Sequence, residues 1–366
     1  MQTLLTIFRE VQDPRDINSR HDVGTILFLA LAATLCGAKS CVDMADFAAG
    51  HEDELSTIVD LPYGAPSHDT FSRLFRLLDP AELAKAFTGF MAALRKELGL
   101  PPPHGVVAID GKSLRRGYEK GRAYLPPLMV SVWDSQTRVA IAQMRAPGGN
   151  EVAATLELLR GLVLKGCTVT ADALHCHPAM AEAVLNAKAG YALGLKANNG
   201  PLYAAAERAF ANAGADVPSL ATEEKAHGRL ERRRVSVLPA PPAARALLPG
   251  LKALGRIEAE RVGTNGKLEM DKRYVALSRQ MTPAKTAEVV RAHWGIENRL
   301  HWILDVVFDE DDARTRKDCG PENLAVIRRL AQNILRMHPS DRSISRKMRA
   351  AQWSKDFFFE LFAHLR

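Results

Sequence analysis

Four ionisable side chains recur at four-residue intervals in the segment 289–312, namely His293, Glu297, His301 and Asp305. Because an α-helix has 3.6 residues per turn, this spacing keeps all four side chains near one face. Apolar residues occupy the rest of the cylinder and predict that the helix is mostly buried: Trp294, Leu300, Ile303, Leu304 and Val307. Buried ionisable groups are costly unless they are paired or bind a metal. The helix is therefore either a polar seam paired with its neighbours or one wall of a metal site, and Gly295 weakens it by ~1 kcal/mol relative to alanine.

Two aspartates elsewhere in the chain each follow a short apolar run of the kind that forms β-strands. Asp110 follows the run 105–109, and Asp172 follows the run 167–171. Further strands are predicted at 128–133, 139–143 and 191–195, and helices at 150–164 and 180–189. This order, β-β-β-α-β-α-β with the 289–312 helix later in the chain, predicts a mixed α/β sheet covered by helices. If the two aspartate strands are parallel neighbours, their ends place Asp110 and Asp172 side by side.

Three carboxylates on such a scaffold suit a two-metal phosphoryl-transfer site. Magnesium prefers oxygen ligands and keeps several of its waters, so Asp110 and Asp172 could share one ion while Glu297 holds the second. Taken singly, an aspartate at a strand end is more often a cap or a turn residue, so the prediction depends on all three together. The alternative enzyme is a mononuclear hydrolase with His293, Glu297 and His301 around one metal.

Basic side chains concentrate near the carboxyl terminus. The chain has a formal net charge of +7, and residues 313–350 alone hold ten Lys or Arg against three Asp or Glu, an excess equal to the whole net charge. Such a surface favours an anionic partner, and we expect phosphate contacts from Arg342, Arg346, Lys347 and Arg349. The five cysteines form no C-x-x-C pair, which indicates reduced thiols. The longest apolar run, 26–36, is shorter than the ~20 residues that span a bilayer, so we expect a cytoplasmic protein.

The composition also predicts how the chain is divided. Residues 1–98 are predicted to form an all-α accessory domain, and residues 104–221 and 283–338 to form the two parts of the core. Residues 222–282 are predicted to be a β-rich insertion, and residues 339–366 a basic tail. The accessory domain is either a helix-turn-helix DNA binder or a helical packing domain. Within the insertion, Arg232 and Arg233 lie either on a solvated strand edge or against phosphate.

Several motifs resemble those of bacterial insertion-sequence transposases. These are AIDGKSLRRG around Asp110, TADALHCH around Asp172, HGRLERR around Arg229 and RAHWGIENRLHWILDVVFDEDDARTR around Glu297. They are most similar to the group that contains the H-repeat-associated proteins linked to Rhs elements. The segment PSHDTFSRLFRLLDP is similar to the helical accessory domain of that group. The resemblance covers nearly the whole chain.

This resemblance implies a ribonuclease-H-like catalytic core, with helices on both faces of its mixed sheet. It implies that Asp110, Asp172 and Glu297 form a DDE triad holding two Mg²⁺ (or Mn²⁺) ions, with support from Asn298 and His301. The implied reaction is cleavage at the inverted-repeat ends of an element, followed by joining to target DNA. The partner would be double-stranded DNA, bound by a homo-oligomer. Candidate DNA contacts outside the carboxyl-terminal set are Lys112, Arg229, Arg232, Arg233 and Arg291.

The chain departs at some positions from the patterns of the transposases that it resembles. Transposases with a Tyr-Arg-Glu-Lys signature carry Tyr, Arg and Lys where this chain has Val290, His293 and Leu304, so those roles do not transfer. Two glycines, Gly148 and Gly149, replace an expected Lys-Ser and remove one basic side chain. Two alternatives remain: a catalytically inactive DNA-binding relic or regulator, and a metal-dependent nuclease or hydrolase unconnected with transposition.

Overall fold

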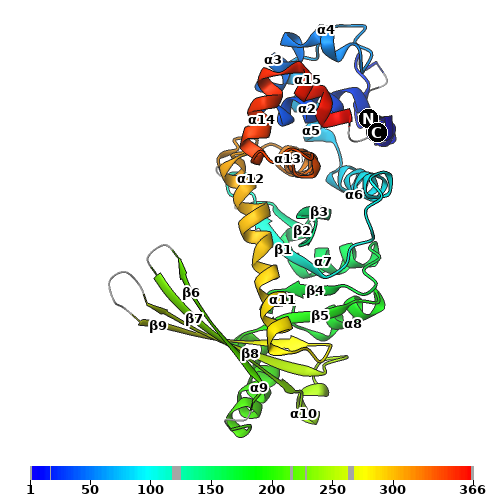
Figure 1. Ribbon diagram of the computed structural model, residues 1–366. Coiled ribbons are helices and arrows are strands. Elements are labelled where there is room, and N and C mark those ends of the chain that lie inside the picture. The colour runs from blue at the N-terminus through cyan, green and yellow to red at the C-terminus, as the bar shows by residue number, and fades with distance from the viewer. Residues whose placement is uncertain are drawn as a thin grey trace.

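The computed structural model describes residues 2–16, 18–117, 125–214, 217–226, 229–262 and 268–363. Figure 1 shows an elongated molecule, with a helical module at one end, a sheet in the middle and an arm of long strands at the other end. The first and the last of the described residues both lie in the helical module. The fold is a mixed α/β fold in which one large sheet is flanked by many helices.

The amino-terminal part of the helical module consists of α1 (Gln2–Arg9), α2 (Val23–Leu35), α3 (Cys41–Gly50), α4 (Glu52–Leu55), α5 (His68–Leu77) and α6 (Pro80–Glu97). Helix α2 is buried along its whole length, as its continuous apolar sequence requires. Asp22 caps it by accepting a hydrogen bond from the Thr25 amide at 3.0 Å. The helical prediction for this part of the chain is confirmed. None of the helices in the described ranges is long and apolar enough to cross a membrane.

The carboxyl-terminal helices complete the same module. They are α13 (Gly320–Met337), α14 (Ile344–Trp353) and α15 (Lys355–Ala363). Phe362 packs against Phe28 of α2 with ring centroids 5.3 Å apart, and Phe358 packs against Phe47 of α3 at 6.0 Å. The segment predicted to be a basic tail is therefore folded as far as residue 363, because Phe358 and Phe362 are buried against the first helices.

In the described residues, nine strands form one sheet in the order β3-β2-β1-β4-β5-β9-β8-β7-β6. The first five are β1 (Val106–Ser113), β2 (Leu128–Asp134), β3 (Val139–Arg145), β4 (Thr168–Ala171) and β5 (Gly190–Leu195), with α7 (Glu151–Arg160) before β4 and α8 (Pro178–Asn186) after it. Strands β1, β4 and β5 are parallel, and β1-β2-β3 is an antiparallel meander. The predicted order β-β-β-α-β-α-β is confirmed.

Strand β1 is longer than its sequence indicated. It pairs with β4 only from Val106 to Ala108, but it continues beside β2 as far as Ser113. Asp110 therefore lies within β1 and not at its end, because a hairpin partner carries the strand past the point where β4 stops. Asp172 does follow its strand directly, as predicted.

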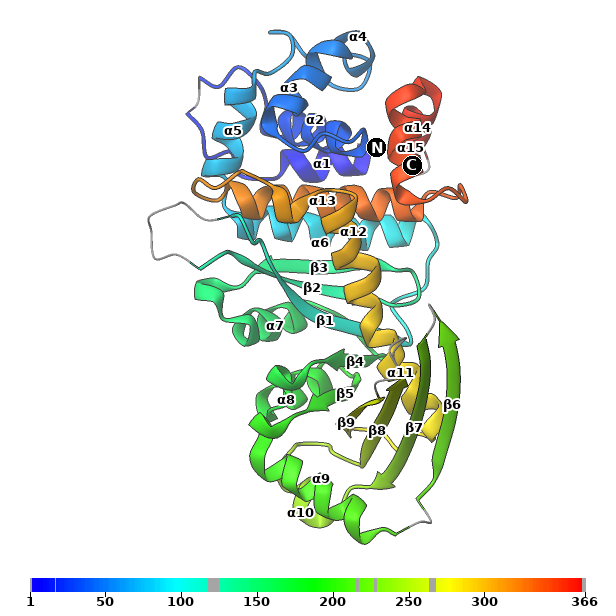
Figure 2. The same cartoon turned by 90° about the vertical axis from the view of Figure 1, so that its left-hand side faces the viewer.

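The insertion extends the core sheet instead of forming a separate β unit. Its strands are β6 (Ser219–Ala226), β7 (Arg229–Pro239), β8 (Ala253–Val262) and β9 (Leu268–Leu277), and β9 pairs antiparallel with β5. These strands make the arm seen in Figures 1 and 2. Two further helices, α9 (Gly200–Asn212) and α10 (Pro242–Arg245), lie near its base and were not predicted. The ring of Tyr274 in β9 packs against Tyr203 and Phe210 of α9, with centroids 5.3 and 5.7 Å away.

Short turns complete the chain. They are the 3₁₀ segments η1 (Pro147–Gly149), η2 (Ala173–His175), η3 (Ala197–Asn199) and η5 (Glu310–Asp312).

The long helix predicted from the ionisable spacing consists of α11 (Pro283–Ile296), a π-helical segment η4 (Glu297–His301) and α12 (Trp302–Val306). It runs along the sheet face opposite α7 and α8 (Figures 1 and 2). Thr282 caps its start by accepting a hydrogen bond from the Lys285 amide. In the π segment, the Arg299 carbonyl accepts a hydrogen bond from Gln332 Nε2 of α13 at 3.0 Å. Such π segments are frequent at functional sites.

Gly295 allows this helix to approach the sheet closely. A β-carbon there would lie 2.6 Å from Cη2 and 2.7 Å from Cζ3 of Trp133, a buried side chain of β2. The glycine that weakens the helix by propensity is thus required by packing. Trp294, by contrast, was predicted to be buried and is 39% exposed, because it faces Arg273 on β9, whose guanidinium carbon is 5.2 Å from its ring centroid.

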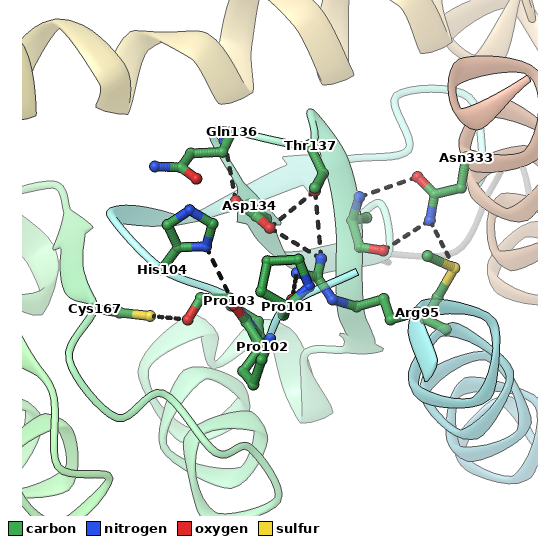
Figure 3. Close-up of polar contacts among 12 residues, drawn as sticks. Arg95, Pro101, Pro102, Pro103, His104, Asp134, Gln136, Thr137, Cys167 and Asn333 are labelled. Carbon is green, nitrogen blue, oxygen red and sulfur yellow. Dashed lines mark hydrogen bonds and ion pairs between the residues drawn. The ribbon is translucent and has the colours of Figure 1, made fainter. Parts of the chain in front are cut away.

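A buried polar network joins the helical module to the sheet (Figure 3). Arg95 of α6 donates to Asp134 Oδ2 of β2 at 3.0 Å and to the Pro101 carbonyl at 2.7 Å. Asn333 of α13 accepts from the Ala140 amide of β3 at 3.0 Å and donates to its carbonyl at 2.7 Å. The bond from Arg95 to Pro101 holds residues 101–103 between the helices and β1, at the boundary predicted between residues 98 and 104.

Replacing Gly295 by alanine tests the close approach of α11. The added methyl group overlaps Trp133, so we expect the free energy of unfolding to fall by about 1–3 kcal/mol. The matched control is Gly89→Ala in α6, where nothing lies within 4 Å of the added atom and helix propensity should raise stability by up to ~1 kcal/mol. Chemical denaturation of both variants measures the difference, and equal stabilisation by the two substitutions would contradict the packing role of Gly295.

Candidate active site

A cleft of about 770 Å³ is lined by residues of α11, of β4 and β5 near their ends, and of the strands of the arm. Asp110, Asp172, Glu297 and Asn298 all line it. The three carboxylates, which are up to 187 positions apart in the sequence (110 to 297), are thus brought to one cavity by the fold. Five arginines and a lysine line the same cleft, namely Lys196, Arg233, Arg261, Arg273, Arg291 and Arg299.

The two aspartates are matched by strand register. The parallel pairing of β1 with β4 ends at Ala108 opposite Thr170, and each aspartate lies two residues further along its strand. Asp172 also begins the turn η2, where its Oδ1 accepts a hydrogen bond from the Leu174 amide at 2.9 Å. Asp172 therefore both caps a turn, as expected of a single aspartate at a strand end, and lines the cleft.

The electrostatics of the cleft favour a bound cation. Burial, together with the nearby carboxylates of Glu151, Glu297 and Asp172, raises the pKa of Asp110 to about 7, although the hydrogen bond from the Gly111 amide opposes the rise. Burial also raises the pKa of Glu297, and the charge of Arg273 opposes this. Asp110 is thus a half-buried acid with several like charges near it. A divalent cation would relieve that repulsion.

The donor chemistry of these groups fits a hard divalent cation such as Mg²⁺ or Mn²⁺, since every candidate donor is a carboxylate oxygen. In the described part of the chain, no group of three His, Cys, Asp or Glu side chains is close enough together to hold a metal ion. The carboxylates share a cleft but have not converged on one point. The same finding applies to His293, Glu297 and His301, so the mononuclear site considered as an alternative is not formed.

The two histidines of the long helix face the sheet and remain neutral. His293 Nδ1 lies 3.1 Å from Thr170 Oγ1 of β4, and burial lowers the pKa of His293 to about 4. His301 Nδ1 lies 3.5 Å from Asp110 Oδ2. Burial, with the charges of Arg329 and Lys112, lowers the pKa of His301 to about 3. His301 therefore meets Asp110 as a neutral ring and does not offset its charge.

Lys112 does not lie where a DNA contact requires it. Its ammonium nitrogen is 2.6 Å from Asp305 Oδ1, 2.9 Å from Asp311 Oδ1 and 3.7 Å from Glu310 Oε2, and the side chain is 8% exposed. Glu310 in turn pairs with Arg329 at 2.9 Å, and both side chains are fully buried. Because a buried cation held by three carboxylates is not free to meet phosphate, the sequence-based role of Lys112 is not supported. At the carboxyl-terminal end of the predicted ionisable face, Asp305 therefore belongs to a seam of paired charges.

The candidate contacts on the arm and on α11 remain accessible. Arg291 pairs with Glu224 at 2.9 Å, Arg232 with Glu223 at 2.7 Å, and Arg233 with Glu231 at 2.7 Å. Exposed pairs of this kind contribute ~0–1 kcal/mol, so exchanging a carboxylate for a phosphate costs little. Arg229 belongs to β7, but its side chain lies outside the described residues.

The carboxyl-terminal basic residues divide into two kinds. Lys347 is buried and donates to the Leu335 and His338 carbonyls at 2.9 and 2.8 Å, so it caps α13 and is unavailable to DNA, contrary to expectation. Arg342 stacks over the Phe357 ring at 5.2 Å. Arg346 and Arg349 are exposed on α14, which Figure 1 places at the end of the molecule opposite the arm.

Several residues of the site were not identified from the sequence. Arg273 and Arg299 line the cleft from β9 and from the π segment. Glu151 begins α7 and is the nearby acid with the largest effect on Asp110. An acid at the first position of a helix usually stabilises the helix through its dipole. The position of Glu151 in the sequence therefore did not indicate a functional role.

The raised pKa of Asp110 predicts a pH-dependent stability in the absence of divalent cations. Folding favours the protonated form, so this contribution is fully present below the unfolded pKa of 3.8 and is lost as the pH rises through about 7. We expect Asp110→Asn to abolish this loss, so that the variant gains stability over the wild type between pH 4 and 8, by at most about 1.4 kcal/mol per pH unit. Denaturant unfolding in EDTA measures it, with Asp60→Asn at an exposed position as the control. Parallel pH curves for wild type and D110N would contradict the assignment.

Comparisons with known proteins agree with the sequence motifs. Residues 101–334 match the family model described as Transposase DDE domain, and residues 5–91 match the model described as DDE_Tnp_1-associated. Two relatives come from Escherichia coli (strain K12): "Putative protein YbfL", 33% identical over 94% of this chain and 93% of its own length, and "H repeat-associated putative transposase YhhI", 32% identical over the same shares. A solved piggyBac transposase synaptic complex with hairpin DNA aligns with 100% of this chain and 77% of that chain, at a TM-score of 0.44 and 14% identity. The family models and the two relatives establish that the chain belongs to the DDE transposase family.

Proposed function

We propose that this protein is the DNA transposase of an insertion sequence, which cuts the ends of its element and joins them to target DNA by two-metal phosphoryl transfer. The observation that carries the proposal is the shared cleft of Asp110, Asp172 and Glu297, lined also by arginines. Membership of the DDE transposase family supports it. We also propose a ribonuclease-H-like core, supported by the strand order β3-β2-β1-β4-β5 and the parallel pairing of β1, β4 and β5.

Divalent metal ions are generally used by this family, and we propose two Mg²⁺ (or Mn²⁺) ions here. Asp110 and Asp172 would hold one ion and Glu297 the other. When bound, such ions activate the attacking hydroxyl and stabilise the leaving oxygen of an in-line displacement. The neutral His301 ring beside Asp110 orients that carboxylate and, being uncharged, does not compete with a metal ion for it. Asn298 lines the same cleft.

The arginines give the cleft its means of binding the DNA backbone. Arg233 and Arg261 approach from the arm, while Arg291 and Arg299 approach from the long helix. Duplex DNA placed between arm and helix would have phosphates on both walls and its scissile bond at the carboxylates. A homo-oligomer bound to both inverted-repeat ends completes the proposal, and Arg346 and Arg349 on α14 offer a second basic surface.

The reaction is tested with a plasmid that carries the native flanks of the gene. With Mg²⁺ or Mn²⁺, the wild type should cut at the flanks, and Glu297→Gln should reduce cutting at least ~100-fold because a ligand carboxylate is lost. The matched control is Glu288→Gln on the same helix, whose side chain is 65% exposed and lies outside the cleft lining, and it should cut normally.

Other outcomes identify the alternatives. Equal cutting by wild type and E297Q would refute the assigned triad and point to another nuclease. Binding of the flanks without any cut, at all metal concentrations, would refute transposition by this copy and identify a DNA-binding relic.

The second basic surface is tested by replacing Arg346 and Arg349 with alanine together. If each contacts one phosphate, the slope of log affinity against log salt should become shallower by ~1.8, at ~0.9 for each contact. A charge-matched control replaces Arg160 and Lys165, exposed residues at and just beyond the end of α7. An unchanged slope in the first pair, measured by fluorescence anisotropy on the flank DNA, would exclude α14 from the interface.

A further inference from the structure

The outer face of α14 is basic, and its sequence contains no acid. From residue 342 to residue 355 the chain has five Lys or Arg and no Asp or Glu. Arg346 and Arg349 are exposed on α14, and among the described residues neither is paired with a carboxylate. The exposed Arg291 of the long helix differs, since it pairs with Glu224 at 2.9 Å. The charge complementarity of α14 therefore favours an anionic partner.

A tryptophan continues the line of these two arginines. Arg346, Arg349 and Trp353 are three and four residues apart, so they lie along one side of the helix. Trp353 is 76% exposed, the highest value among the four tryptophans of the chain. An indole ring offers an apolar face and an N–H donor. The line therefore fits a partner that presents both negative charge and apolar surface.

The opposite side of α14 is fixed to the helical module. Ile344, Met348 and Ala351 are buried, and Lys347 is held by two carbonyls at the end of α13. Figures 1 and 2 show α14 running across the direction of α13, at the outer side of the module. One side of the helix is thus packed while the other projects, which is how helices that recognise DNA sequence are presented.

The major groove of duplex DNA offers both of the features that this line fits. The groove is ~12 Å wide and admits an α-helix, and the ten residues of α14 extend for ~15 Å along its axis. Phosphates border the groove, whereas base edges and thymine methyl groups form its floor. The long arginine side chains reach the phosphates, and the indole ring suits the floor.

We propose that α14 lies in the major groove of duplex DNA, where Trp353 contacts base edges while Arg346 and Arg349 contact the backbone. The helix then distinguishes the element ends from other DNA. The inference rests on the proposed function, since the sequence that it recognises is that of the element ends. It adds recognition of bases to a surface that phosphate contacts alone would leave indifferent to sequence.

The test compares the affinity for flank DNA with that for a scrambled duplex of the same length and composition, by fluorescence anisotropy in EDTA. Trp353→Ala should weaken binding to flank DNA by ~10-fold, the loss typical of one base contact, and leave binding to the scrambled duplex unchanged. Its salt slope should equal that of the wild type, because an uncharged side chain releases no counterions. Trp353→Phe, which keeps an aromatic face, should recover part of the loss.

The matched control is Tyr63→Ala, which removes another aromatic side chain of the helical module, 63% exposed, and should bind both duplexes as the wild type does. Circular dichroism establishes that each variant is folded.

Three outcomes would overturn the inference. An unchanged preference for flank DNA in W353A, while the wild type cuts at the flanks, would refute base recognition by α14 and leave the proposed function intact. A lower molar mass of W353A in light scattering without DNA, with both affinities unchanged, would assign Trp353 to a contact between copies of the chain. A wild type that neither prefers nor cuts the flanks would overturn the proposed function as well.

Discussion

The contact between Gly295 and Trp133 sets where the third carboxylate lies. With no side chain at 295, α11 rests directly on the indole ring of β2, and Glu297 follows only two residues later. Any larger residue would lift the helix from the sheet and draw Glu297 away from Asp110 and Asp172. Since misplacement of a reacting group by ~1 Å can cost ~100-fold in rate, the packing of one glycine controls the geometry of the whole cleft.

Beyond Gly295, the same helix serves two purposes along one face. The π segment that starts at Glu297 leaves this residue open to the cleft, while Leu300 and Leu304 remain buried. Further on, Asp305 enters the paired seam with Lys112, which Glu310 connects to Arg329. Removing one partner of such a buried pair typically costs ~3–5 kcal/mol, so this seam fixes the helix firmly. The amino-terminal half of the face instead presents Glu297 to the cleft.

Much of this arrangement could be predicted from the sequence because it follows from local patterns. The apolar runs gave the strands, and the four-residue spacing gave the helix and its polar face. What depended on tertiary partners could not be predicted. The extension of β1 past Asp110 requires β2, and the exposure of Trp294 requires Arg273 opposite it.

Charge patterns were the least reliable guide to the site. Lys347 was assigned to DNA by the charge pattern and Lys112 by the family resemblance, but each is buried among oxygen acceptors. Arg328 and Arg329 are two of the ten basic residues between 313 and 350, and both are also buried. A count of charges cannot tell a surface cation from a structural one. Glu151 shows the reverse: an acid typical of a helix start packs against Gly111 of β1 and is bonded to the buried His175.

The central claim is that these carboxylates form one divalent-cation site in the cleft. Crystals grown with Mn²⁺ test it most directly, because anomalous scattering locates manganese independently of the protein atoms. The account predicts anomalous peaks in the cleft, ligated by Asp110 and Asp172 on one side and by Glu297 on the other. Well-ordered carboxylates without any peak between them at saturating Mn²⁺, or peaks confined to other parts of the surface, would contradict it.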